Sequence, residues 1–429
     1  MAPTADVMFP TDIRSLRNPD LVEEYYSPGL RSRFHLDGLR LAESKTARKE
    51  YADISYEVDE DKYLARSKAR LEAGGLETEV PNGWPTKVEG PLVWDQSTFK
   101  DESQYIYQLT DEDKDEINRA LAYFKSQDLN GEAITKATFP LPNLGKHLDQ
   151  ICQEVYHGRG FSIVRGLYPE AYSLEDLTMV YLGISSYVAE RRGKQDQRGS
   201  MLLHVIKRNE TDDQYGEDKP FHTDIVTDTL CLFARSLAAE GGRSILASSW
   251  TVYNELAATR PDLIHVLSRP DWPFDTFSRD PPYYRRALMY HYDSKILMSF
   301  GRRLLVGHPP SEPRSEGIPG LTEAQAEALD AVHFIAKKYE IKTTMEKGDM
   351  RFLNNMAVLH RREAFRNDGD SYRHLIRLWL HNDKECWRLP RCLRVAWARV
   401  FEDEERTSFW DLEPPKKDGI IMRVATSCD

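Results

Sequence analysis

The residues of this chain best able to do chemistry are His222, Asp224 and His360. Two histidines and one carboxylate form the facial ligand set that holds non-haem Fe(II) and leaves half of its octahedron open for substrates. Arg373 and Arg377 follow the second histidine. A guanidinium near such a metal can hold a dicarboxylic cosubstrate by its far end. The order of these residues therefore predicts a metal centre with a carboxylate-binding arginine beside it.

The His-x-Asp triplet is weak evidence alone, because this acidic chain contains several copies of it. They begin at His35, His147, His222, His291 and His381. Only the His222 copy is followed by the apolar run 230–233 and then by a histidine–arginine pair. If 221–226 forms a strand, His222 and Asp224 share one face, with Cα atoms about 6–7 Å apart. For the other copies, a histidine that happens to precede an acidic residue is the better interpretation.

The segment Tyr372–Leu380 alternates as a strand does, with Arg373 and Arg377 on one face and apolar residues on the other. Buried guanidinium groups are costly unless an anion accompanies them. The two arginines would lie roughly 13 Å apart, too far to hold one carboxylate together. Structural ion pairs with protein carboxylates are the alternative. The position of His360 just upstream favours ligand binding.

The elements that must position these residues are many short strands flanked by helices. Thr110 and Thr322 open capping boxes, and the apolar spacing that follows each predicts a helix. Strands are expected near 161–164, 201–206, 244–247, 287–306, 341–345, 350–353, 357–361 and 373–380. This pattern predicts an α+β, mainly β fold: a double-stranded β-helix, or jelly roll, with flanking helices. A glycine-rich nucleotide-binding motif is absent from the sequence.

Three segments are expected along the chain. Residues 1–85 form a helical, charge-rich N-terminal extension, 86–400 the jelly-roll domain, and 401–429 a C-terminal tail. The polar loop Arg208–Pro220 runs directly into the predicted metal-binding strand, so we expect it to close over the site.

Composition narrows the classes of partner. The net charge of −11 over 429 residues argues against a nucleic-acid or anionic-membrane surface, and the chain has no apolar stretch long enough to cross a bilayer. Five cysteines without Cys-x-x-Cys spacing favour reduced thiols, and no signal peptide is visible, so a cytoplasmic location is expected. The oligomeric state is left open, a homo-oligomer included.

The order His222-x-Asp224, Gly241-Gly-x-Ser244, His360, Arg373, Arg377 resembles the taurine dioxygenase and clavaminate synthase (TauD/TfdA) group of Fe(II)/2-oxoglutarate oxygenases. A closer likeness, to a fungal branch of that group, is carried by 90–94, 246–255, 260–263, 280–283, 321–330 and 373–380. One member of this branch resembles an oxygenase that closes an aziridine ring on an amino acid.

The resemblance implies that His222, Asp224 and His360 ligate Fe(II). It implies that Arg373 pairs with the distal carboxylate of 2-oxoglutarate, helped by the Ser244 hydroxyl. Arg377 would bind an anionic group of the substrate. The reaction would consume O2, decarboxylate 2-oxoglutarate and remove a substrate hydrogen, leading to hydroxylation, desaturation or ring closure. We expect a small carboxylate-bearing substrate, an amino acid or secondary-metabolite precursor.

Two other functions are kept as alternatives. One is a jelly-roll binding protein without turnover. The other is a metal-dependent jelly-roll enzyme that does not use 2-oxoglutarate, although Arg373 would then have no evident purpose.

Overall fold

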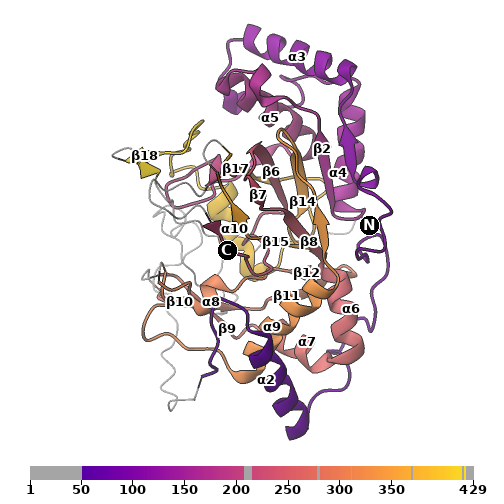
Figure 1. Cartoon of the computed structure of the whole chain (residues 1–429), viewed down its shortest axis with the longest axis vertical. Coiled ribbons are helices and arrows are strands. Elements are labelled where there is room, and N and C mark those ends of the chain that lie inside the picture. The colour runs from indigo at the N-terminus through magenta and orange to yellow at the C-terminus, as the bar shows by residue number, and fades with distance from the viewer. Residues whose placement is uncertain are drawn as a thin grey trace, which may run out of the picture.

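The computed structural model describes residues 51–206, 215–277, 281–310, 312–368, 371–417 and 420–421. In these residues a large and a small β-sheet are surrounded by helices (Figure 1). The large sheet has the order β1 (Ile106–Gln108), β2 (Phe161–Arg165), β14 (Met350–Asn354), β6 (Thr229–Ser236), β17 (His374–His381) and β3 (Arg191–Arg192), with β4 (Leu203–Ile206) also paired to β17. The small sheet has the order β13 (Ile341–Thr343), β8 (Ser244–Ser248) and β15 (Val358–Arg362).

The remaining strands form small ribbons. They are β9 (Trp272–Asp275) with β10 (Tyr283–Arg286), β11 (Met289–Tyr292) with β12 (Lys295–Met298), β18 (Lys416–Lys417) with β19 (Ile420–Ile421), and β5 (Tyr215–Gly216), β16 (Phe365–Arg366) and β7 (Glu240–Gly241). The β11–β12 hairpin turns at Asp293 and Ser294, whose positive φ values of 49° and 59° suit a tight two-residue turn.

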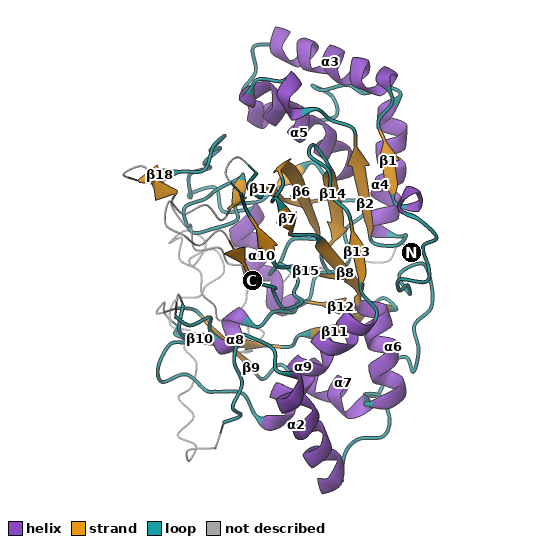
Figure 2. Cartoon of the chain, in the orientation of Figure 1, coloured by secondary structure: helices purple, strands orange, loops and turns teal. Residues whose placement is uncertain are grey.

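Helices cover the sheets on two sides (Figure 2). Their bounds are α2 (Glu60–Ala73), α3 (Asp111–Ser126), α4 (Leu144–Tyr156), α5 (Leu174–Val188), α6 (Ser249–Thr259), α7 (Pro261–Ser268), α8 (Arg303–Val306), α9 (Glu323–Lys338) and α10 (Arg394–Phe401). The predicted capping boxes are present at the starts of α3 and α9. None of the described helices is long and apolar enough to cross a membrane.

The two faces of the large sheet pack in two different apolar clusters. Cys231, Phe352 and Leu378 face outward and pack with α3, α4 and α5. Leu232 and Leu375 face inward and pack with residues of the small sheet such as Leu246. This alternation follows from the two-residue period of a strand. The sheets thus enclose an interior, and the expected mixed fold of the jelly-roll type is confirmed.

The N-terminal extension is described from residue 51 onward. It contains α2, and Asp59 caps the helix by accepting from the Lys62 amide. The helix packs on α9 through Arg66, which pairs with Glu323 and Asp330. Residues 1–50 and 207–214, the latter in the predicted lid loop, lie outside the described residues.

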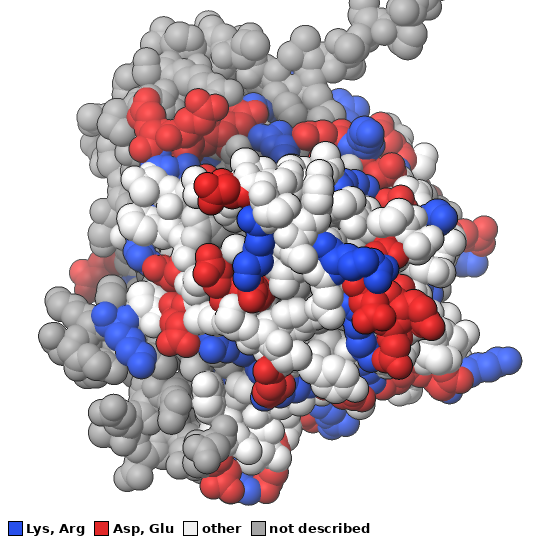
Figure 3. Space-filling model, turned by 90° about the horizontal axis from the view of Figure 1, so that it is seen from above, with Lys and Arg blue, Asp and Glu red and all other residues white. Residues whose placement is uncertain are grey.

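The surface seen from the α3 end carries both signs of charge (Figure 3). On α3 the acidic first turn of Asp111, Glu112 and Asp113 complements the positive end of the helix dipole.

Candidate metal centre and arginine-lined interior

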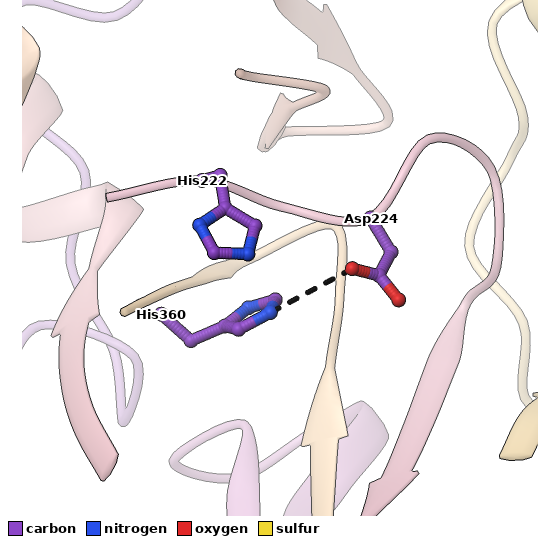
Figure 4. A group of neighbouring side chains, drawn as sticks. All are labelled: His222, Asp224 and His360. Atoms are coloured by element: carbon purple, nitrogen blue, oxygen red, sulfur yellow. Dashed lines mark ion pairs between the residues drawn. The ribbon is translucent and has the colours of Figure 1, made fainter. Parts of the chain in front are cut away.

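The three predicted metal ligands come together. His222, Asp224 and His360 are buried, and one ligating atom from each lies within 4.8 Å of the others. The imidazole rings of the two histidines have centroids 4.4 Å apart, and His360 Nε2 lies 3.7 Å from Asp224 Oδ1. All three side chains point into one space (Figure 4). A cluster of two imidazoles and a carboxylate at this separation could hold one metal ion.

The backbone around His222 differs from the expected strand over 221–226. His222 forms only an isolated antiparallel bridge with His360, through amide–carbonyl bonds of 3.0 and 2.9 Å. Beyond it, the Thr223 amide donates to the Phe300 carbonyl and the Asp224 amide to Asn355 Oδ1. These amides are satisfied outside any strand ladder, so the segment turns away after one bridge. The bridge alone brings the two histidines side by side.

The tautomer of His222 is set by its own loop. His222 Nδ1 lies 2.9 Å from the Pro220 carbonyl oxygen, which can only accept a hydrogen bond. The proton therefore belongs on Nδ1, and Nε2 is the nitrogen with a lone pair for a metal.

The two oxygens of Asp224 have different surroundings. Oδ2 accepts from the Trp379 indole and lies 3.1 Å from Arg377 Nη1. Oδ1 is buried and accepts no hydrogen bond from the described residues. A buried anionic oxygen without a donor is costly. Oδ1 faces the two imidazoles, so this donor set fits a divalent cation.

Arg373 is buried without a carboxylate partner among the described residues. Its guanidinium donates from Nε to the Gly242 carbonyl, at 3.3 Å, and lies 5.9 Å from the Phe365 ring centroid. Burial, together with the nearby cations Arg362 and Arg351, lowers the pKa of Arg373 to about 9. The surroundings disfavour the charge, and an anionic ligand would relieve that penalty.

The glycine turn before β8 makes room for Arg373. Gly241 and Gly242 have φ values of 68° and 73°, in the left-handed region that glycine favours. A Cβ on Gly242 would lie 3.1 Å from Arg373 Cδ. Ser244, buried at the start of β8, follows this turn and pairs in register with Thr343 and Arg362. The turn therefore brings the Ser244 strand next to the Arg373 side chain.

Arg377 has a protein anion beside it. Besides Asp224 Oδ2, it contacts Gln195 Oε1 through Nε at 2.8 Å. Arg377 therefore does not require a substrate anion to compensate its charge, and the alternative of a structural ion pair applies to it. Arg377 nevertheless points toward the metal cluster, so a role beside the substrate stays a prediction.

Three further residues belong to this region but were not assigned to it from the sequence. Trp379 donates to Asp224 Oδ2, and Asn355 also donates to the backbone carbonyl of Asp224, at 2.8 Å. Arg351 lies on β14, on the same interior face as Leu353. The one available signal was the charged residue inside the apolar run Met350–Leu353.

Comparisons with known proteins agree with this geometry. A model of the family "Taurine catabolism dioxygenase TauD, TfdA family" matches residues 125–379, which include all six predicted site residues. The chain belongs to the TauD/TfdA dioxygenase family. It is 34% identical over 347 residues to the taurine hydroxylase-like protein SAT17 of the fungus Stachybotrys chartarum, covering 76% of this chain and 89% of that protein.

Two more similarities extend the comparison. FR-33289 synthase of Streptomyces rubellomurinus is 26% identical over 315 residues, covering 68% of this chain and 90% of the synthase. The fold is similar to that of an asparagine oxygenase solved with Fe(II), 2S,3S-3-hydroxyasparagine and succinate. The TM-score is 0.51 at 15% identity, over 64% of this chain and 93% of that one. The expected class, an Fe(II)- and 2-oxoglutarate-dependent dioxygenase, is confirmed by family membership.

Proposed function

We propose that His222, Asp224 and His360 hold the Fe(II) and that Arg373 binds the distal carboxylate of 2-oxoglutarate. The observation that carries this proposal is the conjunction of a converging ligand set with a buried arginine that has no protein carboxylate. Bound Fe(II) and 2-oxoglutarate supply the activation of O2 that oxidises the substrate.

The chain's own residues would act by positioning. The Pro220 carbonyl keeps the His222 proton on Nδ1, and Trp379 with Arg377 holds Asp224 Oδ2, so that Oδ1 points at the imidazoles. Such outer partners orient metal ligands and raise metal affinity. Arg373 would fix the far end of the cosubstrate, with the Ser244 hydroxyl as a further donor. The enclosing sheets would keep bulk water from the reacting atoms.

The substrate class we propose is a small amino acid or a related carboxylate. Arg377 supports this, since its contact with Asp224 puts a cation beside the metal cluster, where a substrate carboxylate would meet it. The asparagine oxygenase of similar fold was solved with a hydroxylated amino acid, which agrees with this class. Hydroxylation, desaturation and ring closure all remain open as outcomes.

The test is anaerobic titration of Fe(II)-loaded protein with 2-oxoglutarate, followed through the weak visible charge-transfer band. Arg373→Ala should weaken 2-oxoglutarate binding by about 10–100-fold, since it removes charge-assisted hydrogen bonds worth roughly 1.5–3 kcal/mol. Fe(II) affinity should stay largely unchanged. Arg373→Lys should rescue only in part, because the fork of donors is lost. Unaltered 2-oxoglutarate affinity in Arg373→Ala would refute the assignment.

A turnover assay distinguishes an active oxygenase from the binding-protein alternative. With O2 admitted, wild-type protein should form succinate from 2-oxoglutarate, whereas Asp224→Ala should form none. A protein that binds both ligands but never releases succinate with any tested amino acid would favour the binding-protein alternative.

A further inference from the structure

A second interior arginine, Arg351, carries an inference beyond the role proposed for Arg373. It lies on β14, where its Cα pairs in register with Leu232 of β6. Leu232 in turn pairs with Arg377 of β17. Alternation places Arg351 and Arg377 on the same interior face, about two strand spacings or 10 Å apart at Cα. Arg351 thus faces the same enclosed interior as the predicted site.

The Arg351 side chain is fully buried and lacks acceptors within the described part of the chain. Its side chain is 0% exposed, and none of its Nε, Nη1 and Nη2 atoms has a partner in the described residues. The nearby carboxylate of Asp349 is committed to Arg165, at 2.8–3.2 Å. Five N–H donors in a buried group without an acceptor are exceptional, because each unmet donor loses its hydration.

Arg351 and Arg373 affect each other. Burial lowers the pKa of Arg351 to about 10, and the charge of Arg351 in turn helps to lower the pKa of Arg373. Two cations that repel each other, each without a protein carboxylate, are stable together only if something anionic joins them. The carboxylates of Asp349 and Glu102 act on Arg351 from a distance, but neither Arg351 nor Arg373 has an ion pair among the described residues.

We propose that Arg351 is a second cosubstrate-binding residue, which together with Arg373 encloses the distal carboxylate of 2-oxoglutarate. The proposal rests on the function proposed for Arg373. A carboxylate suits the pair, because its two oxygens offer about four acceptor positions and can serve two guanidinium groups from different sides. Arg351 would then select cosubstrates that carry a second carboxylate.

A ligand-truncation experiment tests this selection. Binding of 2-oxoglutarate and of 2-oxobutanoate, which lacks the distal carboxylate, is measured by calorimetry on Fe(II)-loaded protein without O2. Arg351→Met should weaken 2-oxoglutarate binding by about 10–100-fold and leave 2-oxobutanoate binding unchanged. It should also raise the thermal unfolding midpoint of the ligand-free protein, because an unpaired buried charge is removed.

Weaker 2-oxoglutarate binding together with a higher unfolding midpoint distinguishes ligand binding from a structural role. If Arg351 had a structural role, its replacement would make the protein less stable. Arg302→Met is the matched control: Arg302 is 2% exposed but pairs with Asp330, so its replacement should not change the preference for 2-oxoglutarate. If Arg351→Met does not fold, Arg351→Gln gives the same binding comparison with hydrogen-bonding capacity retained.

The possible outcomes distinguish the proposal for Arg351 from the function proposed for Arg373. If Arg373→Met weakens 2-oxoglutarate binding and Arg351→Met does not, the proposal for Arg351 is overturned and the proposed function stands. If neither variant changes 2-oxoglutarate binding, both assignments fail. Equal weakening of both ligands by Arg351→Met would also overturn it, since the residue would then support the metal centre or the fold.

Discussion

Two of the regions that hold buried or partly buried arginines neutralise the charge in different ways. Around α2, α7 and α9, the partly or fully buried arginines meet protein carboxylates. In the interior between the sheets, Arg351 and Arg373 meet none in the described residues. Burial removes water from the guanidinium groups in both regions, so the two regions differ in where the compensating anion comes from. In the first region the protein supplies it, and in the second a ligand would have to.

We call the first region the paired cluster. It consists of Arg66, Arg70, Arg260, Arg302, Asp262, Glu327 and Asp330. Glu327 is 0% exposed and accepts from both Arg70 and Arg260. Although burial opposes it, the Asp262 and Glu327 carboxylates hold the pKa of Arg260 above its ordinary value. The cluster joins α2 to α7 and α9, because Arg66 and Arg70 belong to α2.

The contrast separates structural from functional arginines on physical grounds. A buried guanidinium with its own carboxylate stabilises the fold only while both partners remain. A buried guanidinium without one lowers the stability of the empty protein, and such strain is typical of binding sites.

The largest effect on folding is expected at Glu327. Glu327→Gln removes one of the two carboxylates that neutralise the partly buried Arg70 and Arg260 and leaves Asp262, so the free energy of unfolding should fall by up to about 3–5 kcal/mol. Chemical denaturation monitored by circular dichroism would measure it. The affinity for 2-oxoglutarate in the protein that remains folded should be unchanged. A loss below about 1 kcal/mol would mean that the cluster is no more than a solvent-screened surface network.

Replacing Arg302 and replacing Arg373 should change the free energy of unfolding in opposite directions. Both are almost fully buried, at 2% and 6% exposure. Arg302→Met should lower the unfolding free energy by up to about 3–5 kcal/mol, less where Arg66 still neutralises Asp330. Arg373→Met should raise that of the ligand-free protein by about 1–4 kcal/mol. Thermal unfolding of the two ligand-free variants measures these changes. A loss of stability in both variants would contradict the proposal that a ligand supplies the anion for Arg373.

Much of the fold could be predicted because local signals agree with the global structure. The capping boxes at Thr110 and Thr322, and the alternation over 373–380, each depend on neighbours in sequence. The strand expected over 221–226 was wrong because its amides bond to Phe300 and Asn355, partners far along the chain. Sequence periodicity cannot show where such bonds go.

The metal cluster could be predicted from residue types and order, but the state of the arginines could not. Arg373 and Arg377 look alike in sequence, yet only Arg377 reaches Asp224. Arg351 was missed because one charge in a short strand is ordinary for a surface. Its burial depends on packing that the sequence does not display. Whether a charge has a partner is a tertiary property, and pairing is what separates the two regions.

The helix α9 connects the two regions, and His333 is the residue where they meet. Glu327 and Asp330 of α9 belong to the paired cluster, whereas His333 accepts the Phe221 amide through Nδ1 at 3.2 Å, directly before His222. Burial, with the nearby cations Arg302, Arg361 and Lys337, lowers the pKa of His333 to about 3. A neutral imidazole is also what the bond requires, because Nδ1 must accept from the amide.

The last and smallest effect is therefore a pH dependence that belongs to His333. Its pKa is lower in the folded than in the unfolded state, so the unfolded chain binds the extra proton. This contribution to stability is complete above about pH 6.5 and is lost as the pH falls toward 3. At pH 5 the loss should be about 2 kcal/mol relative to neutral pH. His333→Gln keeps an acceptor for the Phe221 amide but cannot take up the proton, so the difference in unfolding free energy between wild type and variant should shrink or change sign between pH 7 and 5. Denaturation curves at both pH values measure that difference, which cancels the titration of the other groups. A difference that does not vary with pH would show that His333 is protonated as easily in the folded protein as in the unfolded chain.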